Sequence, residues 1–446
     1  MNRVKTLFIL NIILFFTFVG SSKALEVIRD TEIENFTNDI VKILLANTNI
    51  EAEDINVYFI NSKQVNAFVT GGKNIFINTE LIIEAEDYRE YAAVLAHELA
   101  HILGGHIFRT SEELANISNK AMPIYLLGII GLITGASDAG FAGVMVGQAA
   151  VSDTFTYYSR TQEAAADQKA VSILCDSMID ASYLSSFLNS LETIDLNTQS
   201  KSENYRSTHP LPQDRISWIQ LALNSNEKCN YESDKELEKR FNLIKAKLFG
   251  FTHSYDETKA VYKLNNNQGL YANAVSSYLN GEHDKAIEYL EILIENNNNN
   301  PFFKEIIGEI YFMKQNYEEA IYFQTNALNN LGFENDLYTM MLGNYLLSSE
   351  EKEKINDSIY YLKKSIQLNR MNAYSWYLLA RSYALIDDIS LANYATAERY
   401  FLIGERSLSF DFALKAIKEL KENTPEWYRT YDLIEILKKE VSTNTN

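Results

Sequence analysis

The sequence predicts an α+β domain, mostly helical with a small sheet, followed by an all-α domain of superhelical repeats. Strand patterns occur only within residues 25–250, whereas residues 265–440 show one helical pattern after another. The 446 residues include only five prolines and eighteen glycines, which argues against an all-β chain with many turns. With 46% hydrophobic and 22% charged residues, the composition excludes a wholly disordered chain, a collagen-like chain and a polytopic membrane protein.

Residues 1–24 have the three-part pattern of a secretory signal. A short basic start precedes thirteen uncharged residues from Leu7 to Val19, and small residues at Ser22 and Ala24 predict cleavage after Ala24. The alternative is a short N-terminal anchor, although the apolar run is shorter than the ~20 residues that a membrane span needs. The signal contains three basic residues and no acidic one, so its removal changes the net charge from −19 to −22.

The acidic charge and the two cysteines limit the partners and the chemistry. A strongly acidic chain repels phosphate backbones, which excludes nucleic acid as an expected partner. Cys175 and Cys229 are too few for a disulfide scaffold or a cysteine-built metal site. In an exported, oxidising compartment they form either one disulfide or two buried thiols, and the sequence leaves both alternatives open.

The predicted strands all precede the first long apolar helix. Residues 55–60 alternate in polarity as a strand does. Residues 66–70 and 74–78 flank a glycine-containing turn, which predicts a hairpin. Long helical patterns surround these strands, so the first part is an α+β domain.

The apolar helical run that follows contains a metal-ligand motif. His97 and His101 are separated by one helical turn in an H-E-x-x-H pattern and therefore share one helix face. That spacing lets two imidazoles reach one Zn²⁺. Glu98, next to His97, can take a proton from the attacking water and later pass one to the leaving amine. The motif predicts a zinc peptidase with Glu98 as its general base.

Zinc needs a third protein ligand, and Glu163 is the best candidate. No third histidine follows at the distance found in metzincins, because His106 comes only five residues after His101. Glu163 lies on a second helical run, and Asp167 is one turn later on the same face. Asp167 can accept a hydrogen bond from the far nitrogen of a zinc-bound histidine. The alternative is a solvated helix face, but the three alanines between the two acids indicate a packed helix.

The second part of the chain is periodic. Ala286 and Ala320 are 34 residues apart, the period of tetratricopeptide (TPR) helix–turn–helix repeats, and Gly343 follows Gly308 by 35 residues. Small residues at these places let paired helices approach closely, and one pair cannot bury its apolar face without stacked neighbours. We therefore predict TPR-like repeats over residues 265–440; the alternative is an irregular helical bundle.

Several of these motifs together resemble one metallopeptidase family, which contains HtpX and the CaaX-processing protease. The resemblance is strongest to its exported, TPR-bearing branch, the BepA-type β-barrel assembly-enhancing proteases. It rests on five segments of the chain: 29–34, 66–77, 97–106, 163–167 and 208–215. The chain departs from the family at Ala100 and Glu80, where many members have glycine. The resemblance implies a zincin-type metalloprotease domain in which Glu163 is the third zinc ligand.

Three further residues are assigned to the surroundings of the metal. His209, in a T-H-P segment, is expected near the zinc, where it either stabilises the oxyanion or occupies the fourth position as a plug. The alternative is a histidine that fixes a loop before Pro210. His106 is expected to be structural or to support a ligand, and Arg215 to pair with a nearby carboxylate or to pack the loop.

Substrate binding is expected at the predicted hairpin. Zincins hold an extended peptide beside an edge strand by main-chain hydrogen bonds. The segment from Phe68 to Ile77 is the natural edge, with Asn66, Ala67 and Phe68 at its start. Main-chain pairing gives weak sequence specificity, which suits a protease that acts on unfolded chains.

Residues 121–152 form an apolar, glycine-rich stretch with one charged residue, Asp138. Each uncharged arm has about fifteen residues, which is short for a membrane span. One hypothesis is a buried helical hairpin that covers the site, with enough mobility to act as a lid. The other is a hairpin that makes peripheral contact with the membrane or with an insoluble substrate.

Taken together, the sequence predicts an exported, periplasmic zinc endopeptidase of the cell envelope with one Zn²⁺ per chain. Its expected substrates are unfolded or misassembled polypeptides. Its TPR part is expected to bind partners, by resemblance the outer-membrane assembly machinery. The alternative is a chaperone-like TPR adaptor with a latent or silenced protease site. The predicted organisation is a signal at 1–24, a peptidase domain at 25–250 and a repeat domain at 265–440.

Overall fold

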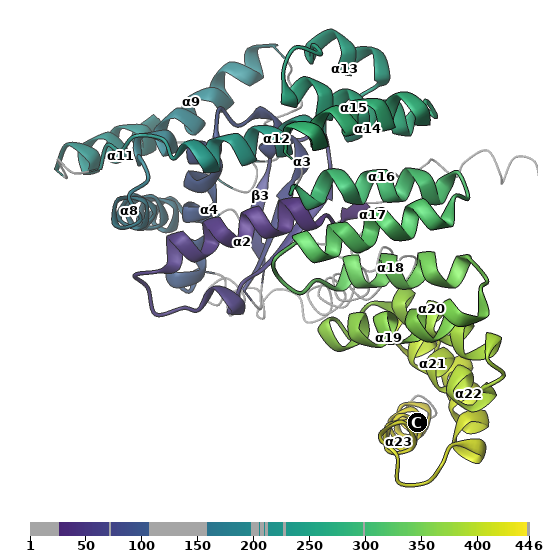
Figure 1. The fold of residues 1–446 in the computed structure, drawn as a ribbon. Helices are drawn as coiled ribbons and strands as arrows, with labels where there is room; N and C mark the ends of the chain where they lie inside the picture. Colours follow the sequence, from purple (N-terminus) through teal and green to yellow (C-terminus); the bar gives the residue numbers. More distant parts are fainter. Residues whose placement is uncertain are drawn as a thin grey trace, which may run out of the picture.

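The computed structural model shows a mostly helical chain with one small sheet (Figure 1). It describes residues 26–70, 73–106, 158–197, 205, 209, 213–225, 229–297 and 299–443. The predicted signal at 1–24 and the apolar stretch at 121–152 lie outside the described residues. Within the described part, no helix has both the length and the apolar character needed to cross a membrane.

The sheet has four strands in the order β1-β2-β4-β3. Their bounds are β1 (Glu26–Ile28), β2 (Asn56–Asn61), β3 (Ala67–Thr70) and β4 (Asn74–Asn78). The predicted hairpin is β3 and β4, which pair antiparallel, while β2 pairs with β4 in parallel. The predicted substrate edge is therefore partly wrong: β3 is an edge strand, but Ile77 lies in β4, between two neighbours. The other edge strand, β1, has only three residues and gave no strand pattern.

Helices pack around this sheet to form the first core (Figure 1). They are α2 (Thr31–Leu45), α3 (Thr79–Glu84), α4 (Tyr88–Leu103), α8 (Arg160–Asp176), α9 (Ser182–Asn197), α11 (Gln213–Ser225) and α12 (Lys235–Thr252), with a short 3₁₀ turn η1 (Ala52–Asp54). The most deeply buried of them is α4, whose side chains are buried from Ala92 to His101. Its alanines let it contact strand β3 and helices α8 and α9.

Two helix starts near the site are capped by side chains. The Asp87 side chain accepts a hydrogen bond from the Arg89 amide at the start of α4. At the start of α8, Ser159 and Gln162 form a reciprocal capping box. These caps hold the helices that carry the metal-ligand motif and its predicted third ligand.

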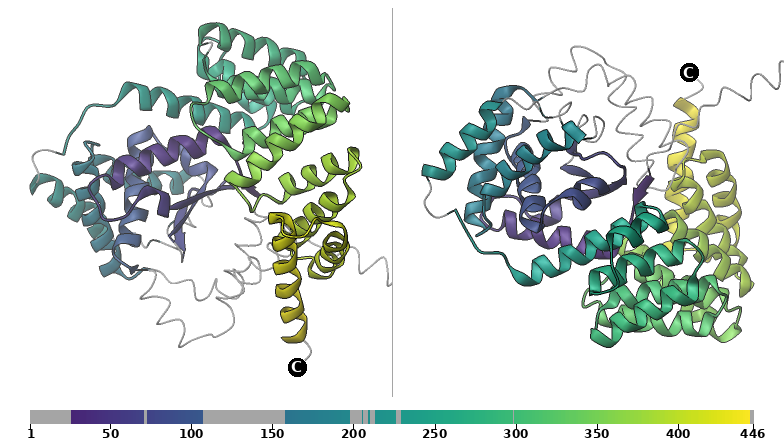
Figure 2. Two further views of the ribbon diagram at one scale, coloured as in Figure 1. Left: turned by 60° about the horizontal axis from the view of Figure 1, so that its bottom comes forward. Right: turned by 90° about the horizontal axis from the view of Figure 1, so that it is seen from above.

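A stack of antiparallel helices follows α12 and runs alongside the α+β half (Figure 2). Its members are α13 (Tyr255–Val261), α14 (Asn267–Leu279), α15 (His283–Asn296), α16 (Pro301–Met313), α17 (Tyr317–Asn330), α18 (Asp336–Ser348), α19 (Lys352–Leu368), α20 (Ala373–Leu385), α21 (Ile389–Leu402), α22 (Arg406–Glu419) and α23 (Pro425–Thr443). This stack confirms the predicted TPR-like superhelical part.

Small residues allow the close helix approaches that the repeat period implied. Ala286 and Ala320 are fully buried. A Cβ added to Gly343 would meet Leu362 Cγ at 2.7 Å, so a larger residue would push α18 and α19 apart. The period in the sequence therefore reflects a steric requirement between paired helices.

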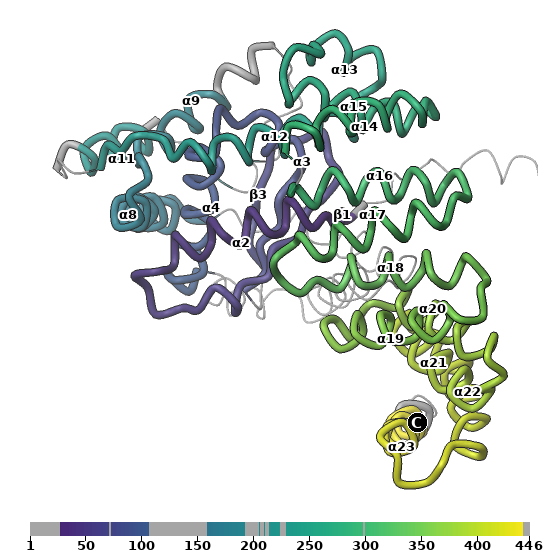
Figure 3. Tube along the Cα trace, viewed as in Figure 1, coloured from purple at the N-terminus to yellow at the C-terminus, as the bar shows by residue number. Residues whose placement is uncertain are grey.

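Helix α12 belongs to both halves of the molecule (Figure 3). Phe241 and Leu248 pack in the core around the sheet, whereas Leu243 packs in the first core of the repeats. The boundary predicted at residue 250 falls inside this continuous helix. Lys247 of α12 forms ion pairs with Asp30 and Glu32 at the start of α2. The two halves are thus joined through a shared helix and a polar contact.

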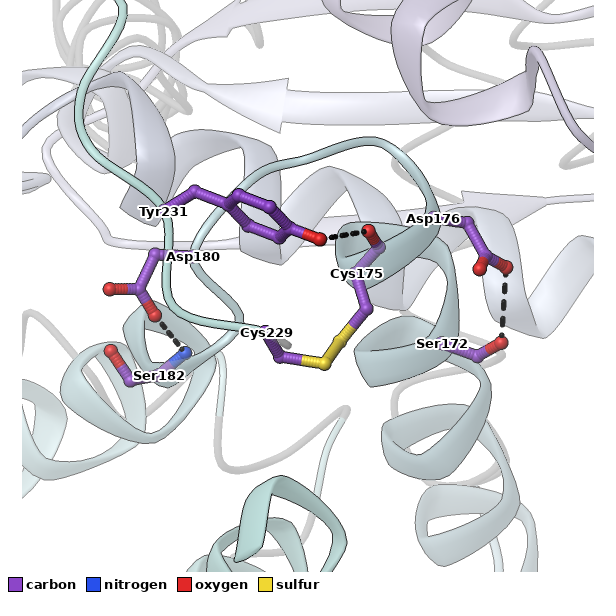
Figure 4. The surroundings of a disulfide bond; sticks show 7 residues. All are labelled: Ser172, Cys175, Asp176, Asp180, Ser182, Cys229 and Tyr231. Atoms are coloured by element: carbon purple, nitrogen blue, oxygen red, sulfur yellow. Dashed lines mark hydrogen bonds between the residues drawn. A yellow bond between two sulfur atoms is a disulfide. The ribbon is translucent and has the colours of Figure 1, made fainter. Parts of the chain in front are cut away.

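The two cysteines form a disulfide, which resolves the alternative that the sequence left open. Cys175 near the end of α8 bonds Cys229, with the two Cα atoms 4.8 Å apart (Figure 4). The Tyr231 hydroxyl donates a hydrogen bond to the Cys175 carbonyl at 3.3 Å. The bond ties the end of α8 to the segment that leads into α12.

Candidate metal centre

Helix α4 presents His97 and His101 on one face, as their spacing predicts. Both side chains are fully buried, and their Nε2 atoms lie 3.0 Å apart. Glu98 is also fully buried, and neither of its carboxylate oxygens has a hydrogen-bond partner among the described residues. Burial raises the pKa of Glu98 above its ordinary value.

Helix α8 brings Glu163 to these two histidines. Glu163 lies in the first turn of α8, directly after the capping box that fixes the start of this helix. Its Oε1 lies 3.3 Å from His101 Nε2, and its Oε2 lies 3.5 Å from His97 Nε2. Burial favours the protonated form of Glu163, but His209, His101 and His97 outweigh burial and hold its pKa well below the ordinary range.

His209 joins the same group. Its Nδ1 lies 3.1 Å from Glu163 Oε1 and 3.4 Å from His97 Nε2, and its Nε2 lies 3.4 Å from Glu98 Oε1. One ligand atom from each of His97, His101, Glu163 and His209 lies within 4.8 Å of the others. The sequence placed His209 near the metal, and the structure brings it into direct contact with the candidate ligands.

Polar partners hold the candidate ligands from behind. Asp167 Oδ1 lies 3.0 Å from His97 Nδ1, the nitrogen that faces away from the group. Arg215 of α11 donates to Asp167 through Nε at 2.7 Å and Nη2 at 2.8 Å, and its Nη1 lies 2.7 Å from Glu163 Oε2. Burial opposes protonation of His97, but Asp167 and Glu163 outweigh burial and raise its pKa to about 9. The sequence left Arg215 as either an ion-pair partner or a packing residue. In the structure it pairs with both Asp167 and Glu163.

His106 supports the other histidine of the motif. Its Nδ1 lies 2.9 Å from His101 Nδ1, and its side chain is buried. The two glycines before it make this contact possible: a Cβ on Gly104 would meet His106 Nε2 at 2.6 Å, and Gly105 has a φ of +62°. The G-G-H segment after the motif thus folds His106 back onto His101.

The charge of the buried group fits a divalent cation. Glu98, Glu163 and Asp167 supply three carboxylates, and Arg215 supplies one cation, so the formal charge of the group without its histidines is minus two. Buried uncompensated carboxylates are strongly unfavourable. A divalent metal would balance this charge, and two imidazoles with a carboxylate form a donor set that suits such a metal.

Two tyrosines contact the site and were missed from the sequence. Tyr158 stacks on His101 with 3.7 Å between ring centroids, and Tyr205 stacks on His209 at 4.7 Å. Both are buried. Tyr158 directly precedes the cap of α8, and Tyr205 comes four residues before His209, so sequence proximity to the motifs was the only available signal.

The predicted substrate residues lie at the edge of the sheet. Ala67 and Phe68 begin β3, and Asn66 precedes them, with its carbonyl accepting a hydrogen bond from the Asn78 amide at 2.9 Å. Phe68 stacks on Phe76 of β4 at 5.2 Å. Because β3 also contacts α4, this edge lies against the helix that carries the metal-ligand motif.

A buried H-E-x-x-H helix, a glutamate from a second helix and a carboxylate behind one histidine define a metallopeptidase centre. Residues 29–222 match the sequence model of peptidase family M48. This match supports an M48-type peptidase domain in this region, and the chain is a metallopeptidase.

The chain is also similar to several named proteases. It is 22% identical over 406 residues to the β-barrel assembly-enhancing protease of Escherichia coli K12, covering 88% of this chain and 80% of the relative. It is 26% identical over 314 residues to the Yersinia pestis protein of the same name, covering 68% and 63%. A shorter alignment shows 27% identity over 188 residues to the human mitochondrial metalloendopeptidase OMA1, and it covers 39% of this chain and 34% of the relative. The first two alignments extend beyond the M48 region into the repeats.

Proposed function

We propose that this chain is a zinc-dependent endopeptidase of the cell envelope that degrades misfolded or stalled exported and outer-membrane proteins. The observation that carries the proposal is the buried group of four donor side chains whose ligand atoms lie within 4.8 Å, with the buried carboxylate of Glu98 beside it, which forms no hydrogen bond with the described residues. The names of the bacterial relatives support the envelope location and the link to β-barrel assembly. The signal pattern at 1–24 supports export to the periplasm.

His97, His101 and Glu163 would hold the zinc ion. Imidazole nitrogens and a carboxylate oxygen are ordinary zinc ligands, and a catalytic site uses three of them. Asp167 orients His97, His106 orients His101, and Arg215 fixes both Asp167 and Glu163. These contacts hold each ligand in one orientation, which is what partners behind a metal ligand contribute to affinity.

When bound, zinc would polarise the scissile carbonyl and make a nearby water more acidic. Glu98 is the residue that takes the proton from that water, because its oxygens are buried next to the candidate ligands and form no hydrogen bond with the described residues. Its raised pKa helps it to keep the proton until the amine leaves. His209 either donates a hydrogen bond to the developing oxyanion or fills the site at rest, and its contact with Glu98 is compatible with both roles.

The substrate would bind as an extended strand along β3. The hydrogen bond between the Asn78 amide and the Asn66 carbonyl sets the ladder, so the alternate residues Ala67 and Val69 direct their amides to the edge of β3 that pairs with no described strand. Those amides can pair with a peptide main chain without reference to its side chains. This mode of binding suits unfolded clients of varied sequence.

Replacing Val69 by Pro tests this edge. The change removes one outward amide but no bond of the β3–β4 ladder, so we expect a large rise in KM with the metal retained. Val69→Ala is the matched control, because it removes the same buried side chain and keeps the amide. Equal activities of the two variants would contradict edge-strand binding.

We propose that residues 25–250 act as the catalytic unit and residues 265–440 as a platform for partners or clients. Helical repeats commonly use extended surfaces of this kind for binding. Large apolar side chains are exposed on the platform, among them Tyr360, Tyr374 and Leu385. The outer-membrane assembly machinery and its stalled clients are the proposed partners, by analogy with the relatives' name.

The alternative is a chaperone-like adaptor whose protease site is silenced, and the contact of His209 with the candidate ligands favours it. Cleavage of casein by wild type and Glu98→Gln, with zinc content measured in both, separates the two. For a protease we expect Glu98→Gln to lose about a hundredfold or more in kcat while keeping zinc.

Glu90→Gln is the matched control for that experiment, because Glu90 is buried on the same helix but accepts its hydrogen bond from the Glu86 amide, away from the site. It should retain the wild-type rate. The adaptor would be established instead if the wild-type protein held zinc but did not cleave casein, and if His209→Ala did not cleave it either.

A further inference from the structure

His209 is packed by two aromatic rings as well as by the candidate ligands. Tyr205 lies 4.7 Å from it, ring centroid to centroid, at 26° between planes, and Tyr158 lies 5.3 Å from it at 30°. The His209 amide also donates to the Tyr205 carbonyl at 2.7 Å. His209 and Tyr205 are fully buried and Tyr158 is 9% exposed, so solvent does not separate the three rings.

Each tyrosine is itself anchored to a different part of the peptidase half. Tyr205 meets Phe187 of α9 edge to face, with centroids 5.2 Å apart. Tyr158 directly precedes Ser159, the cap of α8, and stacks on His101 of α4. The imidazole of His209 therefore rests on rings that are fixed by α4, α8 and α9.

The position that these rings favour is the closed one. Nδ1 of His209 lies beside Glu163 and His97, and its Nε2 lies beside Glu98. The ring thus lies between the candidate ligands and the general base, in contact with both. If His209 fills the site at rest, catalysis requires it to move away from its aromatic neighbours.

We propose that Tyr205 and Tyr158 form an aromatic clamp that holds His209 in the closed position and so sets the resting activity of the peptidase. This inference rests on the proposed function and deepens it, since it names the residues that govern access to the same site. The tyrosines are positioning residues: they act through His209 and not on the substrate. Aromatic pairs of this kind are worth enough to shift an open–closed equilibrium by about two- to tenfold each.

Tyr205 offers the cleaner test, because Tyr158 also packs on the ligand His101. Tyr205→Leu removes the stacked ring but keeps an apolar side chain, and Tyr205→Phe keeps the ring. We expect Tyr205→Leu to raise kcat/KM on casein by about two- to tenfold and Tyr205→Phe to match wild type. In a His209→Ala background, Tyr205→Leu should have no further effect, because the group that it releases is gone.

A second readout does not depend on turnover. Acylation of His209 by diethylpyrocarbonate, followed by mass spectrometry of the full-length protein, should be faster in Tyr205→Leu and unchanged in Tyr205→Phe. Zinc content and thermal unfolding of each variant identify any loss of the fold.

The outcomes are distinct. An equal effect of Tyr205→Leu with and without His209 would overturn the clamp, and so would unchanged acylation of His209 in a folded Tyr205→Leu variant. Lower activity in both Tyr205→Leu and His209→Ala would also overturn the clamp. It would show that His209 assists the reaction from the position that it occupies in the structure. Failure of the proposed function itself would appear separately, as an activity that Glu98→Gln does not remove.

Discussion

Two groups of buried or half-buried charges in this protein both contain an excess of acids and differ in geometry. The first is the metal centre, and the second is a junction cluster made of Asp30, Glu32, Lys247, Glu305 and Glu309. The junction cluster lies between α2, α12 and α16, and four of its residues line a cavity of about 260 Å³: Asp30, Lys247, Glu305 and Glu309. Both groups contain more carboxylates than cations.

The difference lies in where the donor atoms point. In the metal centre the imidazoles and a carboxylate converge within 4.8 Å, and in the part of the chain that the structure describes no other group of histidines, cysteines and acids does so. In the junction cluster the acids surround one ammonium group instead: Lys247 pairs with Asp30 and Glu32, and the Tyr271 hydroxyl donates to Glu32 at 2.8 Å. An excess of acids is thus not enough to define a metal site, whereas convergent imidazoles with partners behind them are.

The pKa shifts follow the same division. Histidines hold the pKa of Glu163 well below its ordinary range, although burial opposes this. In the junction cluster, burial prevails over the attraction of Lys247 and raises the pKa of Glu305 to about 8. The first group keeps its carboxylate charged and ready to bind a cation, and the second keeps a carboxyl neutral at ordinary pH.

The largest expected effect comes from breaking the junction. Lys247→Met leaves the carboxylates of Asp30 and Glu32 without their buried cation, so we expect the free energy of unfolding to fall by about 3 kcal/mol. Zinc content should stay at one per chain, because no candidate ligand is touched. Urea unfolding and metal analysis measure the two quantities.

The control for this change is Lys285→Met, which removes an exposed lysine paired with Glu282. Surface pairs of this kind contribute little, so this variant should unfold like wild type. If Lys247→Met were as stable as the control, the junction would not be a structural ion-pair cluster.

A smaller effect, confined to the metal centre, is expected from Asp167→Asn. Asparagine has the size of aspartate but no negative charge, so it holds the His97 imidazole less strongly. Zinc affinity should therefore fall about 10- to 100-fold. Competition with a metal chelator measures the affinity. Asp176→Asn, at the exposed end of the same helix, should leave it unchanged; a fall in both variants would point to a general effect of charge.

The smallest effect concerns pH. Because the folded pKa of Glu305 lies above that of an unfolded glutamate, its stabilising contribution is complete at acidic pH and is lost as the pH rises to about 8. The free energy of unfolding of the wild type should decrease between pH 5 and pH 9. Because glutamine cannot ionise, this decrease should be smaller in Glu305→Gln by about 1–2 kcal/mol. Glu318→Gln, at an exposed position in α17, should keep the wild-type slope. Identical slopes in all three proteins would contradict the assignment.

The sequence was most informative where function depends on spacing along one helix or one repeat. His97 and His101 share a face because 3.6 residues make a turn, and that relation needs no tertiary contact. The 34-residue period likewise indicated stacked helix pairs, and the structure has them. The hairpin of β3 and β4 followed from its glycine-containing turn.

The sequence was less informative where elements distant in the chain meet. The inner place of β4 depends on its parallel pairing with β2, which periodicity cannot reveal. The shared role of α12 was also missed, since its apolar residues serve two cores at once. The disulfide was one of two open alternatives, because the distance between Cys175 and Cys229 is set by the packing around α8.

By itself, then, the sequence determined the chemistry that this protein carries: the H-E-x-x-H helix, a repeat array and a glutamate suited to be the third ligand. Only the tertiary structure decided how the parts converge. It brings His209 against Glu163 from 46 residues away along the chain and Arg215 against Asp167 from 48 residues away, and it packs Tyr158 and Tyr205 beside His209. The physical reason is that local sequence governs backbone hydrogen bonding within each helix, whereas the mutual placement of helices depends on burying apolar and charged groups from the whole chain at once.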